Sequence, residues 1–137
     1  MSKPIINIYW FKRDLRIIDN VPLQLSCDDE HPTLLIFLFE PELVNNAHHS
    51  ERHWNFIQDS ILDINKNLKK YKTKIHCFDL NAIKFFKKIS NRYTINKIFS
   101  HQETGINITY KRDKDVSNYC KENDIEWHEE IRNGVFR

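Results

Sequence analysis

The chain has 137 residues, a length that predicts one domain with a single core and no linker. Its 21 basic and 19 acidic residues give a formal net charge of +2, which excludes the strongly basic overall field typical of nucleic-acid-binding proteins. Only two glycines occur, Gly105 and Gly134, so the glycine-rich phosphate loops of Walker and dinucleotide-binding motifs are excluded as well.

The three cysteines, Cys27, Cys77 and Cys120, are far apart and form no CxxC pair. This pattern argues against a disulfide framework and a structural zinc site, and it favours a reducing, cytoplasmic setting. The N-terminus lacks the apolar core of a signal peptide, and no apolar run approaches the ~20 residues of a membrane helix. We therefore expect a soluble protein with no membrane partner.

The chain opens with a predicted strand that leads into a charged loop. Ile5, Ile6 and Ile8 are apolar and β-branched without a helical period, which is typical of a parallel strand buried on both faces. Four charged side chains follow within the stretch 12–16. Because α/β folds hold ligands in loops at the carboxyl ends of strands, this loop is the first candidate for a binding site.

A short helix over 21–26 is predicted next, with Asp19 or Asn20 as its cap and Pro22 in its first turn. The continuously apolar run 34–39 predicts a second buried strand, which ends at Glu40 and Pro41. A charged residue thus stands at the exit of this strand too.

The clearest helix begins near Ser50, because apolar residues recur at spacings of three and four: Trp54, Ile57, Ile61, Ile64 and Leu68. Lysines gather in its last turns at Lys66, Lys69, Lys70 and Lys72, where positive charge suits a helix C-terminus. We interpret this lysine run as a solvated face.

The remaining elements continue the alternation. Strands are predicted over 74–78 and 95–100 and from 125 onward, and helices over 82–89 and 109–123. Strands that alternate with helices imply right-handed parallel crossovers and a doubly wound α/β sheet.

No catalytic or metal-binding set is evident in the sequence. His49 and His53 stand at i and i+4 beside His48, but no third ligand accompanies them, so we expect solvated histidines. Ser50, Asp59 and His101 do not form a recognisable nucleophile, base and orienter. We expect no hydrolase and no metal site.

Several segments resemble the DNA photolyase and cryptochrome family. The stretch from Trp10 to Arg16 with Asp19, Asn20 and Leu23 resembles the opening signature of the family, in which Lys12 replaces the commoner arginine. Weaker matches follow in the same order along the whole chain: Phe37 to Pro41, with Glu40 for the commoner aspartate; Ser50 to Arg52 with Phe56; Glu103 to Gly105 with Arg112, Asp113 and Val116; and Asn133 to Val135.

The resemblance implies that residues 1–137 form the N-terminal domain of such a protein, a Rossmann-like five-stranded parallel sheet of order 3-2-1-4-5 flanked by helices. This domain would bind an antenna chromophore, a folate, a deazaflavin or FMN. The helical C-terminal domain, which lies outside these 137 residues, would hold FAD and bind damaged DNA. The chain alone is therefore not expected to be catalytic, and its partner would be that helical domain; DNA repair and blue-light signalling both stay open for the full-length protein.

With that strand order, ligands bind beyond the carboxyl ends of the first and fourth strands, where the order reverses. A planar chromophore needs an aromatic wall, donors for its carbonyls and a carboxylate for its ring nitrogens. The side chains expected there are Lys12, Arg13, Asp14, Phe39, Glu40, Arg52, His101, Gln102 and Glu103.

Simpler structural roles compete with ligand binding at some positions. Arg13 and Asp14 could pair with each other or with neighbouring loops and hold the first turn rigid, and Arg16 and Asp19 are expected to have this structural role, since buried charges are generally paired. Trp10, Trp54 and Trp127 are expected to be core or domain-interface aromatics.

Two other functions stay open. The chain could be a stand-alone nucleotide-binding or flavin-binding Rossmann-like module, because the fold alone allows it. Alternatively, the pocket could be empty and the domain could serve as a scaffold for the flavin domain. Whether the domain binds an antenna chromophore or serves only as a scaffold, the face that docks the helical domain should leave an apolar patch, and this patch should promote self-association of the isolated domain.

Overall fold

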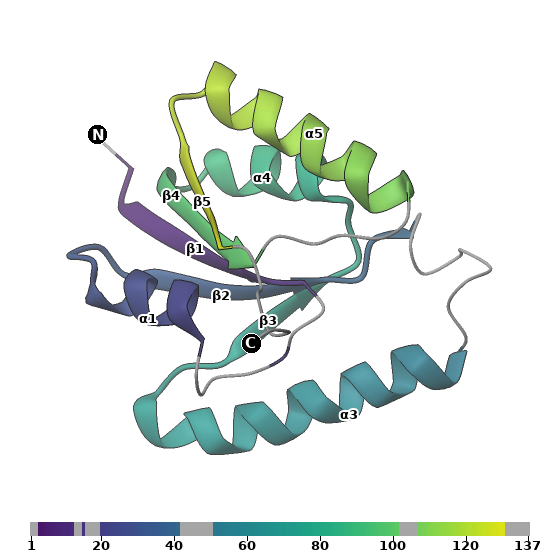
Figure 1. Cartoon of the computed structure of the whole chain (residues 1–137). Coiled ribbons are helices and arrows are strands. Elements are labelled where there is room, and N and C mark those ends of the chain that lie inside the picture. Colours follow the sequence, from purple (N-terminus) through teal and green to yellow (C-terminus); the bar gives the residue numbers. More distant parts are fainter. Residues whose placement is uncertain (1–2, 13–14, 16–19, 42–50, 102–106, 131–137) are drawn as a thin grey trace, which may run out of the picture.

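A computed structural model of the chain describes residues 3–12, 15, 20–41, 51–101 and 107–130 (Figure 1). Its five strands are β1 (Ile5–Phe11), β2 (Thr33–Leu38), β3 (Ile75–Phe78), β4 (Thr94–His101) and β5 (Glu126–Glu130). Its helices are α1 (Val21–Asp28), α3 (Glu51–Leu68), the 3-10 helix η1 (Lys69–Tyr71), α4 (Ala82–Ser90) and α5 (Asn107–Glu122).

The strands form one parallel sheet of order β3-β2-β1-β4-β5, which confirms the predicted topology. The central strand β1 pairs with β2 on one side and with β4 on the other. The order of the strands therefore reverses between β1 and β4, and the carboxyl ends of these two strands mark the topological switch point.

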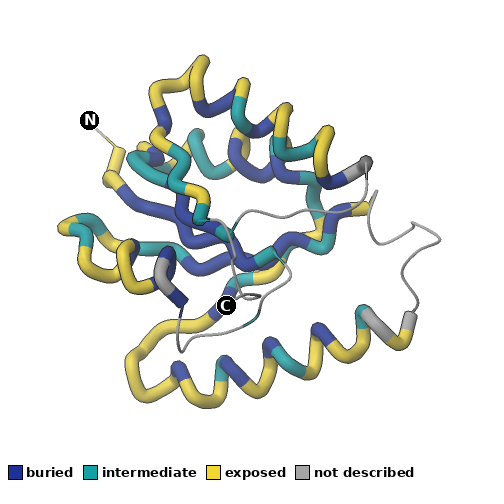
Figure 2. The backbone as a smooth tube through the Cα atoms, viewed as in Figure 1, coloured by how far each residue is buried: buried dark blue, intermediate teal, exposed yellow. Residues whose placement is uncertain are grey.

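Helices cover both faces of the sheet, with α4 and α5 on one face and α1 and α3 on the other (Figure 1). Strand β1 is buried along most of its length (Figure 2), and its side chains alternate between the two cores. Ile6, Ile8 and Trp10 pack in the cluster that contains residues of α4 and α5, whereas Tyr9 and Phe11 pack in the cluster that contains residues of α1 and α3.

The predicted strands and helices are confirmed, with shifts at their ends. Strand β1 continues to Phe11, beyond the predicted run of isoleucines, because Tyr9, Trp10 and Phe11 alternate between the two cores. Strand β2 ends at Leu38, one residue before Phe39. The apolar stripe of α3 is buried as expected at Ile57, Ile61, Ile64 and Leu68, and Trp54 packs partly buried against the same cluster.

Asn20 caps helix α1, which decides between the two predicted capping residues. Its side-chain oxygen accepts a hydrogen bond of 3.1 Å from the backbone N–H of Leu23, and Pro22 occupies the first turn. The Asn20 amide also donates to the Tyr9 hydroxyl at 2.8 Å, which ties the start of α1 to β1. Arg16 and Asp19, both expected to have a structural role, lie outside the described residues.

None of the described helices combines the length and the apolar character needed to cross a membrane.

Trp10 is a core residue, and Trp127 packs partly buried against the same core cluster.

Asp29, the residue that follows α1, links this helix to the sheet. It forms an ion pair of 3.0 Å with Lys97 of β4, and its carboxylate accepts the backbone N–H of His31 at 3.1 Å. Hydrogen bonding to Asn7, then to His31 and Lys97, lowers the pKa of Asp29 to about 2.

We predict that Asp29→Asn destabilises the protein at neutral pH and that this difference disappears in acid. A carboxylate with a lowered pKa stabilises the fold above its unfolded pKa of 3.8, and this stabilisation is lost as the pH falls through about 2. Urea unfolding of both proteins at a series of pH values measures the difference. A difference that stays constant from neutral pH to pH 2 would contradict the assignment.

Candidate functional site

Charged and aromatic side chains follow the strands at the carboxyl edge of the sheet. Lys12 follows β1, Phe39 and Glu40 follow β2, His101 ends β4, and Glu129 lies near the end of β5. Because the strands are parallel, these positions share one edge. The two-residue period of strands divides them between the faces: Lys12, Glu40 and Glu129 belong to the α4/α5 face, whereas Phe39 and His101 belong to the α1/α3 face.

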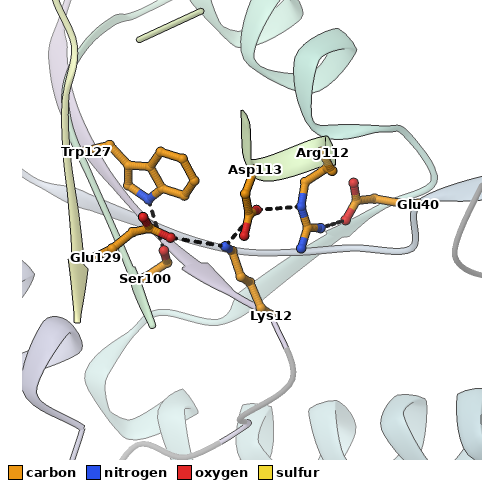
Figure 3. A network of polar contacts seen from close by, with 7 residues as sticks. All are labelled: Lys12, Glu40, Ser100, Arg112, Asp113, Trp127 and Glu129. Carbon is orange, nitrogen blue, oxygen red and sulfur yellow. Dashed lines mark hydrogen bonds and ion pairs between the residues drawn. The ribbon is translucent and has the colours of Figure 1, made fainter. Parts of the chain in front are cut away.

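The ammonium group of Lys12 lies between the carboxylates of Asp113 and Glu129 (Figure 3). Its side chain is 3% exposed, and its Nζ lies 3.0 Å from Asp113 Oδ1 and 3.8 Å from Glu129 Oε2. The same Nζ lies 4.6 Å from the centre of the Trp10 ring and 4.9 Å from that of Trp127, within the range of cation–π attraction. Strand β1 therefore ends in a cation that is compensated on several sides.

Arg112, in the second turn of α5, extends these contacts to β2. Its Nε donates to Asp113 Oδ1 at 2.7 Å, its Nη1 donates to Glu40 Oε1, and its guanidinium carbon lies 4.8 Å from the centre of the Trp10 ring. Five side chains thus form a continuous chain of ion pairs, which we call the carboxyl-edge network: Glu129, Lys12, Asp113, Arg112 and Glu40 (Figure 3).

Aromatic packing and burial complete this face of the edge. Trp127 stacks on Trp10 with ring centres 6.1 Å apart, and its Nε1 donates to Ser100 Oγ at 3.0 Å. Burial raises the pKa of Glu129; the neighbouring carboxylate of Asp113 adds to this effect, whereas Lys12 and Arg112 oppose it. The network therefore combines two cations with three carboxylates, and the pKa of one of these carboxylates, that of Glu129, is raised above its ordinary value.

The described side chains on the α1/α3 face of the same edge are mostly aromatic. His101 Nε2 lies 3.1 Å from Asn20 Oδ1, so the cap of α1 connects β4 with the Tyr9 hydroxyl of β1. Phe39 packs edge-on between Phe37, at a ring distance of 4.8 Å, and Trp54 of α3, at 5.9 Å. These rings form an apolar wall on this side of the edge.

The structure brings two of the predicted site residues into one network and places others apart from it. Lys12 and Glu40 are connected through Asp113 and Arg112, Phe39 and His101 lie on the opposite face, and Arg52 is exposed on α3. Arg13, Asp14, Gln102 and Glu103 lie outside the described residues. Contact of any of these nine residues with a ligand stays a prediction.

Three members of the network were not among the predicted site residues. Arg112 and Asp113 belong to a segment that resembles the family, and their charges one turn into a helix after a strand exit were an available signal. Glu129 gave no such signal, because its role depends on how far β5 extends along β4.

The network is suited to holding the ends of the strands in place, since its charges form ion pairs with one another. Arg112 and Lys12 share the Asp113 carboxylate, which fixes the start of α5 against the ends of β1 and β2. Within the described part of the chain, no group of three or more histidine, cysteine or acidic side chains is arranged to hold a metal ion. The histidines proposed to be solvated, His48 and His49, and the side chain of His53 lie outside that part.

A doubly wound parallel sheet with polar side chains gathered at its carboxyl edge defines a Rossmann-like ligand-binding domain. Comparison with known proteins identifies its family. The model of the DNA photolyase family matches residues 7–136. The chain therefore belongs to the DNA photolyase family.

Individual relatives agree with this assignment. The deoxyribodipyrimidine photo-lyase of Buchnera aphidicola (subsp. Acyrthosiphon pisum, strain APS) is 26% identical over 110 residues, which cover 77% of this chain and 23% of that protein. Cryptochrome-1 of Aedes aegypti is 23% identical over 134 residues, which cover 91% of this chain and 24% of that protein. The chain thus spans about a quarter of the length of these curated relatives.

A solved structure is similar over nearly the whole chain. The archaeal photolyase from Sulfolobus tokodaii superposes with a TM-score of 0.79 and 26% sequence identity, and the match covers 96% of this chain and 32% of that one. That structure is described as containing two FAD molecules, with the implication of a novel light-harvesting cofactor.

We predict that Lys12→Met lowers the free energy of unfolding by about 3 kcal/mol, because it breaks a buried ion pair, leaves Asp113 with Arg112 alone and removes the cation nearest to Glu129. Lys88→Met, at an exposed position of α4, is the matched control and should leave this free energy almost unchanged. Urea unfolding at neutral pH measures both effects.

A second substitution tests whether the loss comes from the network. Glu129→Gln removes one of the stranded carboxylates, so it should recover part of the stability of the Lys12→Met protein, and a double-mutant cycle measures this coupling. Additive effects of the two substitutions would show that Lys12 and Glu129 are not coupled.

Proposed function

We propose that this chain is the antenna-chromophore-binding domain of a photolyase or cryptochrome. The observation that carries the proposal is the match to the DNA photolyase family over residues 7–136 on a sheet whose switch point lies between β1 and β4. Ligands of doubly wound folds bind beyond the carboxyl ends of the strands at such a point.

The relatives support a chromophore with a fused, planar ring system. The photolyase of Sulfolobus tokodaii carries a second FAD in addition to a first, and its description connects this with light harvesting. A flavin is therefore the first chromophore to test on this chain, beside the folate and the deazaflavin that the family resemblance suggests. The described edge offers an aromatic wall in Phe39 and Trp54, which suits a planar ligand.

We propose different roles for the predicted site residues. Lys12 and Glu40 are buried and committed to ion pairs, so we assign them to positioning the edge. Arg13 and Glu103 are the proposed contacts of the chromophore, a guanidinium for its carbonyl oxygens and a carboxylate for its ring N–H groups. Asp14, His101 and Gln102 are proposed to line the same site; Arg52 is proposed to lie at its side.

The proposed partner is a helical domain that binds FAD in the full-length protein. The relatives extend well beyond the matched region, since this chain covers 23% of one and 24% of another. Light-driven repair of damaged DNA and blue-light signalling are both activities proposed for that whole protein, and transfer of excitation from the antenna to FAD would be the contribution of this domain.

Titration of the purified chain with FMN, FAD, a reduced folate and a deazaflavin tests the proposal, with ligand absorbance and fluorescence as the readouts. We expect one of them to bind and Arg13→Ala or Glu103→Ala to weaken it by about 10-fold or more, since each removes a charge-assisted hydrogen bond.

Arg92→Ala and Glu122→Ala, at exposed positions, are the matched controls and should leave affinity unchanged. Tight binding of ATP or AMP without affinity for any of the four chromophores would instead favour a stand-alone nucleotide-binding module. Equal binding by the Arg13 and Glu103 variants would reject the assigned contacts.

A further inference from the structure

A lysine-rich hollow lies at the opposite edge of the sheet from the carboxyl-edge network. It has a volume of about 340 Å³ and is lined by Lys69, Lys72, Thr73, Lys74 and His76, which belong to the turn between α3 and β3 and to β3 itself. This turn is exposed along its length (Figure 2). Because β3 begins at Ile75, the hollow stands at the amino-terminal edge, away from the proposed antenna site.

The segment that forms most of this hollow carries charge of one sign. Residues 66–74 contain five lysines and no acidic residue, and all five are exposed: Lys66, Lys69, Lys70, Lys72 and Lys74. Within the described ranges of the chain, no ion pair joins any of them to a carboxylate. The nearest acidic residues along the chain are Asp63 and Asp79, outside the lysine-rich segment. An anion that enters the hollow therefore meets uncompensated positive charge.

The other groups in and beside the hollow suit a nucleic-acid strand. Thr73 contributes a hydroxyl and His76 an imidazole, which burial and then Lys74 keep at a lowered pKa. Tyr71, between two of the lysines, is 65% exposed and has the Lys70 ammonium 5.2 Å from its ring centre. An exposed aromatic ring among cations is the combination with which proteins stack bases and neutralise phosphates of single strands.

The backbone fixes the place of Lys72 at the hollow. Lys72 is the C-cap of η1 with a φ of 58°, in the left-handed region that glycine adopts without strain, and its backbone N–H donates to the Lys69 carbonyl at 3.0 Å. The cap therefore holds Lys69 and Lys72 close together at the same hollow.

We propose that this hollow and the exposed Tyr71 beside it bind single-stranded nucleic acid, with the lysines on its phosphates and the tyrosine ring against a base. The run of charge extends past the hollow at Lys66 and Lys70, so it fits a strand of several phosphates better than one isolated phosphate. The proposal does not depend on the antenna function, because the two sites lie at opposite edges of the sheet.

Fluorescence anisotropy of the 137-residue chain with a labelled DNA strand of about 20 nucleotides tests the proposal. If the three lysines of the hollow each neutralise one phosphate, affinity should fall about 20-fold between about 50 and 200 mM salt. Lys72→Gly suits the local backbone, so a loss of binding is not due to unfolding; it should reduce that fall to about 7-fold.

Combined substitution of Lys69, Lys72 and Lys74 should remove most of the binding and its salt dependence. Lys84→Ala, Lys87→Ala and Lys88→Ala together remove the same charge from exposed positions of α4 and should bind like the original protein. If both triple variants weaken binding equally, only overall charge matters and the site is rejected.

The aromatic contact and the class of ligand are tested separately. Tyr71→Ala should weaken binding about 5-fold or more while Tyr71→Phe preserves it, because stacking needs the ring and not the hydroxyl. If AMP binds as tightly as the DNA strand, the ligand of the site is a free nucleotide and the proposal is wrong. If anionic phospholipid vesicles bind and DNA does not, the ligand is a membrane surface and the proposal is wrong as well. Arg13→Ala should leave DNA binding unchanged, which separates this result from the antenna test.

Discussion

The burial of a single ammonium group organises the carboxyl edge of this domain. Lys12 follows the central strand directly, and an ammonium removed from water without partners is too costly to keep charged. Asp113 must therefore approach from α5 and Glu129 from β5, and Arg112 then balances Asp113 and reaches Glu40 after β2. One buried cation thus fixes the mutual placement of three strands and a helix at the edge where a ligand of this fold would bind.

The same edge presents two different environments because side chains alternate along the strands. Lys12 is two residues after Trp10, and Glu129 is two residues after Trp127, so all four side chains lie on the α4/α5 face. His101 of β4 points to the opposite face, which α1 covers, and lies beside Asn20. Among the described residues, the ion pairs of the carboxyl-edge network lie on the first of these faces beside Trp10 and Trp127, and the rings of Phe39 and Trp54 lie on the second. The charges of the first face pair with one another, so they hold the ends of the strands in place.

The sequence was sufficient for features that depend on short-range pattern. Continuous apolar runs predicted β1 and β2, and the spacing of Ile57, Ile61, Ile64 and Leu68 predicted the buried stripe of α3. Partnership within the network was not predictable in this way, because Lys12 and Asp113 are 101 residues apart and meet only through sheet order and register. From the sequence, Lys12 was named only as a possible ligand contact, and its ion pairs with Asp113 and Glu129 were missed.

Net charge was a poor guide to local electrostatics for a similar reason. Residues 66–74 contain five lysines and no acidic residue, which is a formal charge of +5. The rest of the chain has 16 basic and 19 acidic residues, a formal charge of −3, so the net charge of the whole chain hides this local excess. Screening makes surface charges act over about 8 to 10 Å, so a ligand responds to the turn and not to the total. The domain therefore has two chemically distinct edges. At one edge, opposite charges form ion pairs with each other; at the other, lysines of like charge are exposed to water.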